Sequence, residues 1–305
     1  MPCLTCKAPP TIDKGAKLEA GRIVAVFSRR YLVEGAGGML VACMPRGRNN
    51  AYACGDRVAF SMSGSDQGLI DAADPRSSLF LRSDRYRTKL IAANVTQLLV
   101  LVAVEPSFSV EFVDRALVAA KSQRIPALIA CNKIDLQPQA LAALATLRPY
   151  RAIGYPVIEF AAKRDCAPLR PHLQGHVTLL LGQSGMGKST LVNRLAPEAN
   201  AATREISTAL DSGKHTTTHA RLYHLDQETD LIDCPGMQEF GLAHLPFREL
   251  EHGFTEFDSL LGQCRFANCR HRDEPDCAIR KALAGGGIAA QRYASFRRIA
   301  EEATE

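Results

Sequence analysis

The chain of 305 residues contains no tryptophan, and only 6% of its residues are aromatic. The sequence also shows no apolar run long enough to cross a membrane and no amino-terminal apolar stretch of signal-peptide form. We therefore expect a cytoplasmic protein without membrane contact. In that reducing compartment the ten cysteines should be thiols or metal ligands rather than disulfides.

The most specific pattern is a glycine-rich loop that follows the apolar run 176–181 and precedes a segment with helical apolar spacing. In this strand–loop–helix arrangement, backbone N–H groups and the helix amino terminus surround phosphate oxygens. Lys188 is expected to reach the β- and γ-phosphates, and Ser189 to bind Mg²⁺. The predicted phosphate-loop contacts are Gly182, Gln183, Ser184, Gly185, Met186, Gly187, Lys188, Ser189 and Thr190.

A second motif, residues 132–135, follows the apolar run 125–131 and is expected to recognise the base of the nucleotide. Asp135 can accept hydrogen bonds from the N1–H and N2–H₂ donors of guanine, and Lys133 can lay its aliphatic stem over the ring. The expected base contacts of this motif are Asn132, Lys133, Ile134 and Asp135. A companion segment follows the run 155–159, where Ala162 and Lys163 are expected to contact the guanine oxygen through a backbone N–H.

The order of these motifs is unusual, because the base-recognition motif at 132–135 precedes the phosphate loop at 182–190. In ordinary GTPases the phosphate loop comes first. Either one of the two matches is accidental, or the nucleotide-binding domain is circularly permuted. Permutation is physically acceptable when the original ends of a compact domain lie close together.

Two further segments complete a guanine-nucleotide switch. Asp233 is expected to hold Mg²⁺ through water, and the Gly236 N–H to sense the γ-phosphate. In the polar segment 213–218, Thr217 is expected to cap Mg²⁺, with Thr216 as the alternative. His215 is a candidate to orient the attacking water, and the alternatives are that it contacts a partner or only faces solvent.

Met237 directly follows Gly236 and occupies a position where many GTPases carry a water-orienting glutamine. A methionine side chain cannot hydrogen-bond a water usefully. The free enzyme is therefore expected to be slow.

The carboxy-terminal region carries a compact set of metal-binding residue types. Three cysteines and one histidine fall within fourteen positions, a set that suits a closed, structural tetrahedral zinc site. They are Cys264, Cys269, His271 and Cys277. Buried free thiols are the alternative. By contrast, Cys43, Cys131 and Cys234 lie in or beside apolar runs and are expected in the core.

The pattern of apolar runs, turn residues and charges divides the chain into four parts. We expect a flexible tail at 1–16, an OB-like barrel of short strands at 17–84, an α/β nucleotide domain at 85–245 and a helical zinc-binding domain at 246–305. The net charge is +5, and residues 17–90 hold twelve Lys/Arg against seven Asp/Glu, so the excess lies there. A basic barrel is a plausible nucleic-acid platform, with Tyr31, Tyr52 and Tyr86 as stacking candidates. The alternative is a solvated surface with core tyrosines.

The ordered set of motifs resembles one family over nearly the whole chain: the circularly permuted GTPases of small-ribosomal-subunit maturation, of the RsgA (YjeQ) type. The matching segments are 21–24, 29–33, 132–135, 182–190, 214–218, 233–236, 239–242 and the cluster 264–279. Ala161 departs from the pattern, which usually has serine there.

The resemblance implies a GTPase, with zinc and Mg²⁺ as cofactors, that is stimulated by the 30S subunit and its 16S rRNA. It further implies binding near the decoding region and a late role in releasing assembly factors. We expect the protein to be a monomer. Two alternatives remain: a GTP-sensing module on a non-ribosomal RNA, which Met237 slightly favours, and an ATP-dependent enzyme such as a kinase, against which Asp135 argues.

Overall fold

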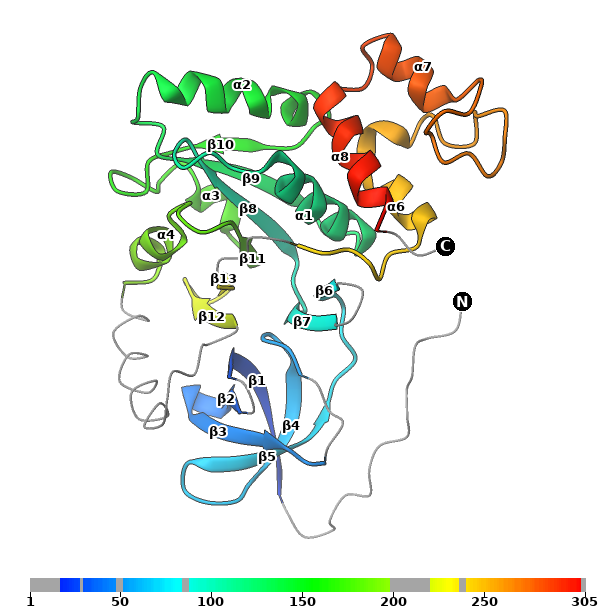
Figure 1. The fold of residues 1–305 in the computed structure, drawn as a ribbon. Helices are drawn as coiled ribbons and strands as arrows, with labels where there is room; N and C mark the ends of the chain where they lie inside the picture. The colour runs from blue at the N-terminus through cyan, green and yellow to red at the C-terminus, as the bar shows by residue number, and fades with distance from the viewer. Residues whose placement is uncertain are drawn as a thin grey trace.

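The computed structural model describes residues 17–27, 30–47, 52–83, 88–197, 220–235 and 240–302. A strand-rich amino-terminal part, a central α/β part and a helical carboxy-terminal part follow one another along the chain (Figure 1). The predicted multidomain fold is confirmed. Among the described residues, no helix is both long and apolar enough to span a bilayer.

The amino-terminal part is a closed five-stranded barrel, as predicted. Its strands hydrogen-bond in the order β1-β2-β3-β5-β4, and β4 pairs back with β1 to close the ring. Close packing explains one of its glycines, since a Cβ at Gly21 would lie 2.5 Å from Val33 Cγ1. The strands are β1 (Leu18–Val26), β2 (Tyr31–Glu34), β3 (Leu40–Pro45), β4 (Arg57–Met62) and β5 (Gln67–Ala73), and a short 3-10 turn, η1 (Ala36–Gly38), separates β2 from β3.

One tyrosine expectation is wrong. Tyr52 is only 7% exposed, and its ring meets that of Tyr31 edge-on at 5.5 Å between centroids. Because this ring fills the barrel core, it cannot stack on a base, and the alternative of a core tyrosine holds for Tyr52. Tyr86 lies outside the described residues.

The central part is a six-stranded sheet in the order β10-β9-β8-β11-β13-β12. The first five strands are parallel, and β12 runs antiparallel to β13. From β8 the chain adds β9 and then β10 on one side of β8, and the next strand, β11, pairs with the other side of β8. Ligands bind at the carboxyl ends of strands beside such a reversal. The strands are β8 (Gln97–Ala103), β9 (Ala127–Asn132), β10 (Val157–Glu159), β11 (Val177–Leu181), β12 (Ala220–His224) and β13 (Asp230–Asp233).

Helices cover both faces of this sheet. Every residue of β8 is buried, and because side chains alternate along a strand they enter two different cores. Leu98, Val100 and Val102 pack with α1, whereas Leu99 and Leu101 pack with residues of α3 and α4. The helices are α1 (Val110–Ser122), α2 (Gln139–Ala152), α3 (Arg170–Leu173) and α4 (Lys188–Leu195).

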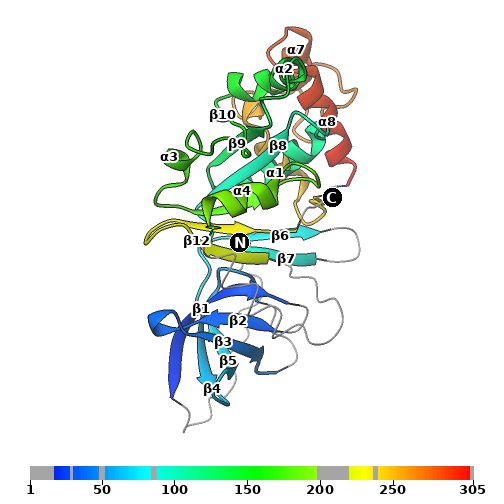
Figure 2. The ribbon, with the colours of Figure 1, turned by 90° about the vertical axis from the view of Figure 1, so that its left-hand side faces the viewer.

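The barrel and the central sheet are joined by main-chain hydrogen bonds. Strand β1 pairs with β12 at Ala25–Arg221 and Val26–Ala220, so all eleven strands form one sheet. Figure 2 shows β12 between the barrel and the rest of the central part. His224 spans the same seam, because its Nδ1 lies 2.6 Å from Asp230 Oδ1 and its Nε2 2.9 Å from Glu34 Oε2. The hydrogen bond to Asp230 raises the pKa of His224 to about 9, so it is charged at neutral pH.

A separate hairpin, β6 (Leu79–Ser83) and β7 (Thr88–Ala93), lies beside the seam (Figure 2). The Ser83 N–H donates to Gly241 O at 3.0 Å, and the Ala243 N–H donates to Ser83 O at 3.2 Å. The predicted domain boundary at residues 84 and 85 falls between these two strands. The hairpin would therefore be shared between the two domains.

The carboxy-terminal part contains α6 (Phe247–Gly253), η2 (Thr255–Phe257), α7 (Ala278–Ala284) and α8 (Ala290–Ala300). It packs on α1 through a buried ion network. Arg292 is 1% exposed, and its Nη1 lies 2.5 Å from Asp114 Oδ1. The same guanidinium donates twice to Glu256, at 2.7 and 2.9 Å, and the Tyr150 hydroxyl donates to Asp114 at 2.6 Å. These contacts fix the helical part to the central part.

Candidate nucleotide and metal sites

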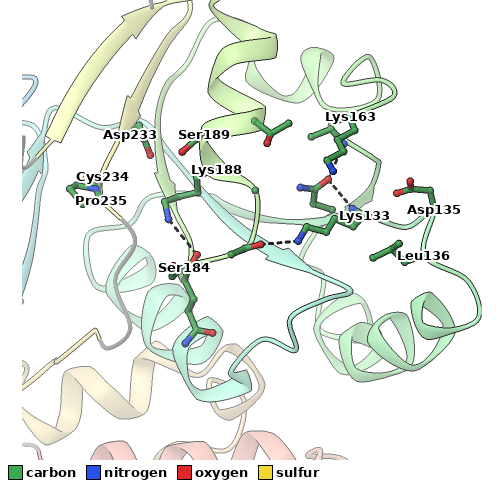
Figure 3. A pocket seen from close by; sticks show the side chains of 16 residues that line it. Lys133, Asp135, Leu136, Lys163, Ser184, Lys188, Ser189, Asp233, Cys234 and Pro235 are labelled. Carbon is green, nitrogen blue, oxygen red and sulfur yellow. Dashed lines mark hydrogen bonds between the residues drawn. The ribbon is translucent and has the colours of Figure 1, made fainter. Parts of the chain in front are cut away.

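The carboxyl ends of four parallel strands bring the predicted nucleotide motifs to one cavity of about 590 Å³ (Figure 3). The figure shows Lys188, Ser189 and Asp233 toward one end of the cavity and Lys133, Asp135 and Lys163 toward the other. Segments from residues 132–136, 162–163, 183–190 and 233–235 all contribute to the lining. The reversed order of the motifs along the chain therefore does not separate them in space.

The glycines of the phosphate loop are required by close approach. Gly187 has φ +95°, and a Cβ there would lie 2.4 Å from Asn132 Nδ2. At Gly182 a Cβ would lie 2.7 Å from Leu101 O. Any side chain at either position would push the loop away from its neighbours.

Lys188 is the first residue of α4, and its side chain folds back over the loop. Its Nζ donates to Gly182 O at 2.7 Å, which holds the ammonium group inside the curl of the backbone. Burial lowers the pKa of Lys188, while Asp233 acts in the opposite direction. An anionic group in the cavity would stabilise this partly desolvated cation.

Asp233 ends β13, and the surroundings of its carboxylate are suited to a cation. Its Oδ1 is buried and has no hydrogen-bond partner in the described part of the chain. Burial raises the pKa of Asp233 to about 6, although Lys188 opposes this effect. A buried carboxylate with an unused oxygen is costly unless a cation or donor meets it. The site therefore fits a hard cation such as Mg²⁺, which prefers oxygen ligands.

Asn132 ties three loops together. Its Nδ2 donates to Met186 O of the phosphate loop at 2.9 Å, and its Oδ1 accepts from the Ala162 N–H at 2.9 Å. The neighbouring Lys133 extends along the cavity, where its Nζ donates to Glu105 O and Gly185 O at 2.5 and 2.9 Å. These two contacts fix the ammonium end of the side chain.

Two details of the base end were not predicted. Asp135 is paired with Arg164, whose Nε lies 3.4 Å from Asp135 Oδ2. The Ala162 N–H is already used by Asn132, whereas the Lys163 backbone N–H has no acceptor among the residues described. Of the two residues expected to contact the guanine oxygen, Lys163 is therefore the one with a free donor.

The catalytic candidates cannot be located in the same way. His215, Thr216 and Thr217 lie outside the described residues, as do Gly236 and Met237. Their segments adjoin described elements: residues 198–219 connect α4 to β12, and residues 236–239 follow the cavity residue Pro235.

The four predicted metal ligands do come together. One donor atom from each of Cys264, Cys269, His271 and Cys277 lies within 4.8 Å of the other three. His271 Nδ1 lies 3.6 Å from Cys264 Sγ and 3.3 Å from Cys277 Sγ, and the two sulfurs are 3.9 Å apart. The cluster could hold a metal ion, so the alternative of unrelated buried thiols is not supported.

A carboxylate behind this cluster was missed by sequence reasoning. Glu251 of α6 accepts a hydrogen bond from His271 Nε2 at 2.6 Å, which leaves Nδ1 facing the three sulfurs. Metal-bound histidines commonly have such a partner on the other ring nitrogen. Glu251 lies twenty positions before His271 in the chain, and no sequence signal connects the two. The remaining expectation for cysteines is confirmed, because Cys43, Cys131 and Cys234 are all buried.

Known proteins share this arrangement. The model of the family described as RsgA GTPase matches residues 73–243. A small ribosomal subunit biogenesis GTPase RsgA from Burkholderia pseudomallei is 49% identical over 297 residues, covering 96% of this chain and 95% of that protein. YjeQ from Thermotoga maritima has a TM-score of 0.70 and 28% identity, covering 94% of this chain and 98% of its own. YloQ, described as a circularly permuted GTPase, has a TM-score of 0.67 and 26% identity, covering 96% and 97%. Family match, whole-length relatives and fold agree, and the chain belongs to the RsgA GTPase family.

Proposed function

We propose that this protein hydrolyses GTP and couples that hydrolysis to late maturation of the small ribosomal subunit. The main support is that the base-recognition and phosphate-binding motifs, whose order along the chain is reversed, line the same cavity. The relatives named for small ribosomal subunit biogenesis support the cellular role, since they match over nearly the whole chain. We expect binding near the decoding region and release of an assembly factor.

We assign base recognition to the loops after β9 and β10. Asp135 would accept from guanine N1–H and N2–H₂, and the Lys163 N–H would donate to the guanine oxygen. Lys133 would support the ring face with its stem. Asn132 would act by holding the loops in register, which its contacts to Met186 and Ala162 support.

We assign phosphate binding to residues 182–190 and the magnesium site to Ser189, Asp233 and Thr217. Lys188 would exchange its contact with Gly182 O for the β- and γ-phosphates. A bound Mg²⁺ would supply charge neutralisation of the phosphates. The Gly236 N–H would report the γ-phosphate. We propose that His215 orients the attacking water, a role supported by its position in the segment between α4 and β12.

For the Cys/His cluster we propose structural zinc. A tetrahedral ion with Zn–S of about 2.3 Å and Zn–N of about 2.0 Å requires about 3.8 Å between sulfurs and about 3.5 Å from nitrogen to sulfur. The distances of 3.9, 3.6 and 3.3 Å are close to those values. Four protein ligands would leave no open position for catalysis.

We propose that the partners are the 30S subunit with its 16S rRNA, bound through the basic barrel, and that the protein works as a monomer in the cytoplasm. The excess of positive charge at residues 17–90 supports the choice of a nucleic-acid partner. The boundaries at 16, 84 and 245 are kept as proposed domain limits.

The test is a GTPase assay of the purified protein with and without 30S subunits. We expect slow turnover alone and strong stimulation by 30S subunits but not by 50S subunits. His215→Ala should abolish the stimulation while GTP binding is retained. A protein that is indifferent to 30S subunits would refute the ribosomal role.

A further inference from the structure

Three loops surround the proposed base and phosphate sites: the base loop (residues 132–135), the guanine-oxygen loop (residues 160–165) and the phosphate loop (residues 182–190). Asn132 connects the base loop to both of the others. Lys133 adds a second tie to the phosphate loop through Gly185 O. None of these contacts joins the guanine-oxygen loop directly to α4, the helix that begins within the phosphate loop.

A direct contact between the guanine-oxygen loop and α4 comes from a residue outside all the recognised motifs. Arg194, in the last turn of α4, donates from Nη2 to Lys163 O at 2.6 Å across 31 positions of sequence. The donor is a permanently charged guanidinium, so this is a charge-assisted hydrogen bond. Lys163 lines the cavity, and its own N–H has no acceptor in the part of the chain that is described.

We propose that Arg194 is a positioning residue for guanine recognition, which sets the guanine-oxygen loop at a fixed distance from the phosphate loop. This inference rests on the proposed function, because it requires a guanine nucleotide in the cavity. Helix α4 starts at Lys188 and runs to Leu195, so it forms a rigid link from the phosphate end to Arg194. By holding the carbonyl of Lys163, Arg194 orients the residue whose N–H would meet the guanine oxygen.

The mechanism predicts a selective effect. A ligand with both a base and phosphates spans the two ends of the cavity and depends on their spacing. A ligand with phosphates alone contacts only the phosphate loop, the amino terminus of α4 and Asp233 through Mg²⁺. Removal of Arg194 should therefore weaken nucleotides and leave inorganic tripolyphosphate unaffected.

The experiment measures dissociation constants of the full chain for GDP, IDP and inorganic tripolyphosphate, each with Mg²⁺. IDP keeps the oxygen and N1–H of guanine but lacks the N2 amino group, so it tests the oxygen contact when Asp135 can accept only one of its two hydrogen bonds. Arg194→Ala should weaken GDP and IDP by about two- to five-fold, the range of one solvent-exposed hydrogen bond. Tripolyphosphate affinity should not change.

Two variants keep the test decisive. Arg194→Lys retains a charged donor and should recover part of the affinity for GDP. Arg298→Ala removes an equally charged arginine that pairs with Glu111 away from the cavity, and it should leave all three constants unchanged. If the wild-type protein fails to bind GDP, the proposed function is wrong. If it binds GDP but Arg194→Ala changes nothing, or weakens tripolyphosphate equally, the positioning role is wrong.

Discussion

The buried carboxylate of Asp233 should destabilise the ligand-free protein at neutral pH. Burial raises its pKa from 3.8 to about 6, so the folded state binds more protons than the unfolded state between about pH 4 and 6. Stability must therefore fall as pH rises through that window and level off above it. At about 1.36 kcal/mol per pKa unit, the shift corresponds to roughly 3 kcal/mol.

Asp233→Asn removes this charge while keeping the size of the side chain. We expect the variant to be more stable than the wild type by up to about 3 kcal/mol at pH 7.5, and by only about 1 kcal/mol at pH 4.5. The assay is urea unfolding in EDTA at both pH values. Asp66→Asn, which changes an exposed carboxylate, is the control and should shift neither curve by more than about 0.5 kcal/mol.

Bound ligand should reverse this difference in stability, so that the wild type becomes more stable than Asp233→Asn. With Mg²⁺ and GDP present, the wild type should gain stability by mass action, and the variant much less, because a neutral amide attracts the cation less strongly than a carboxylate does. If Asp233→Asn were no more stable than the wild type in EDTA at pH 7.5, or if the difference did not depend on pH, the description of Asp233 as a buried, unsatisfied cation site would be wrong.

Three further substitutions test other parts of the account. Gly187→Ala should weaken GDP binding about ten-fold or more with the fold retained by circular dichroism, since its Cβ would lie 2.4 Å from Asn132 Nδ2 at φ +95°; unchanged affinity would contradict this packing. Glu251→Gln should lower zinc affinity about 10- to 100-fold in chelator competition, because the charge behind the cluster histidine is lost; an unaltered affinity would leave Glu251 without that role. Arg292→Met should cost about 3–5 kcal/mol in urea unfolding, because Asp114 loses its buried partner; a loss below about 1 kcal/mol would show that the network is dispensable.

Much of this architecture could be predicted because its signals are local. Apolar runs before residues 132, 160 and 182 mark strands, and the motif after each run sits at the carboxyl end of a strand. Parallel strands share that edge, so the loops had to meet whatever their order. The cysteine cluster was also local, since its four ligands fall within fourteen positions.

The missed features depend on contacts between distant segments. The pairing of β1 with β12 rests on the register of Ala25 and Arg221, and neither residue carries a recognisable pattern. Glu251 and Arg194 are ordinary charged helix residues by sequence, and only folding brings them to His271 and Lys163. Tyr52 lies in the connection between β3 and β4, and only folding brings its ring into the barrel core against Tyr31.

The central claim is that two motifs in reversed order build one guanine pocket. Asp135→Asn tests it most directly, because an amide at this position would match the exocyclic oxygen of xanthine instead of the amino group of guanine. We predict that GDP affinity falls sharply while XDP affinity rises, with tripolyphosphate binding unchanged. A variant that keeps its preference for GDP would contradict the claim and separate residues 132–135 from the phosphate loop in function.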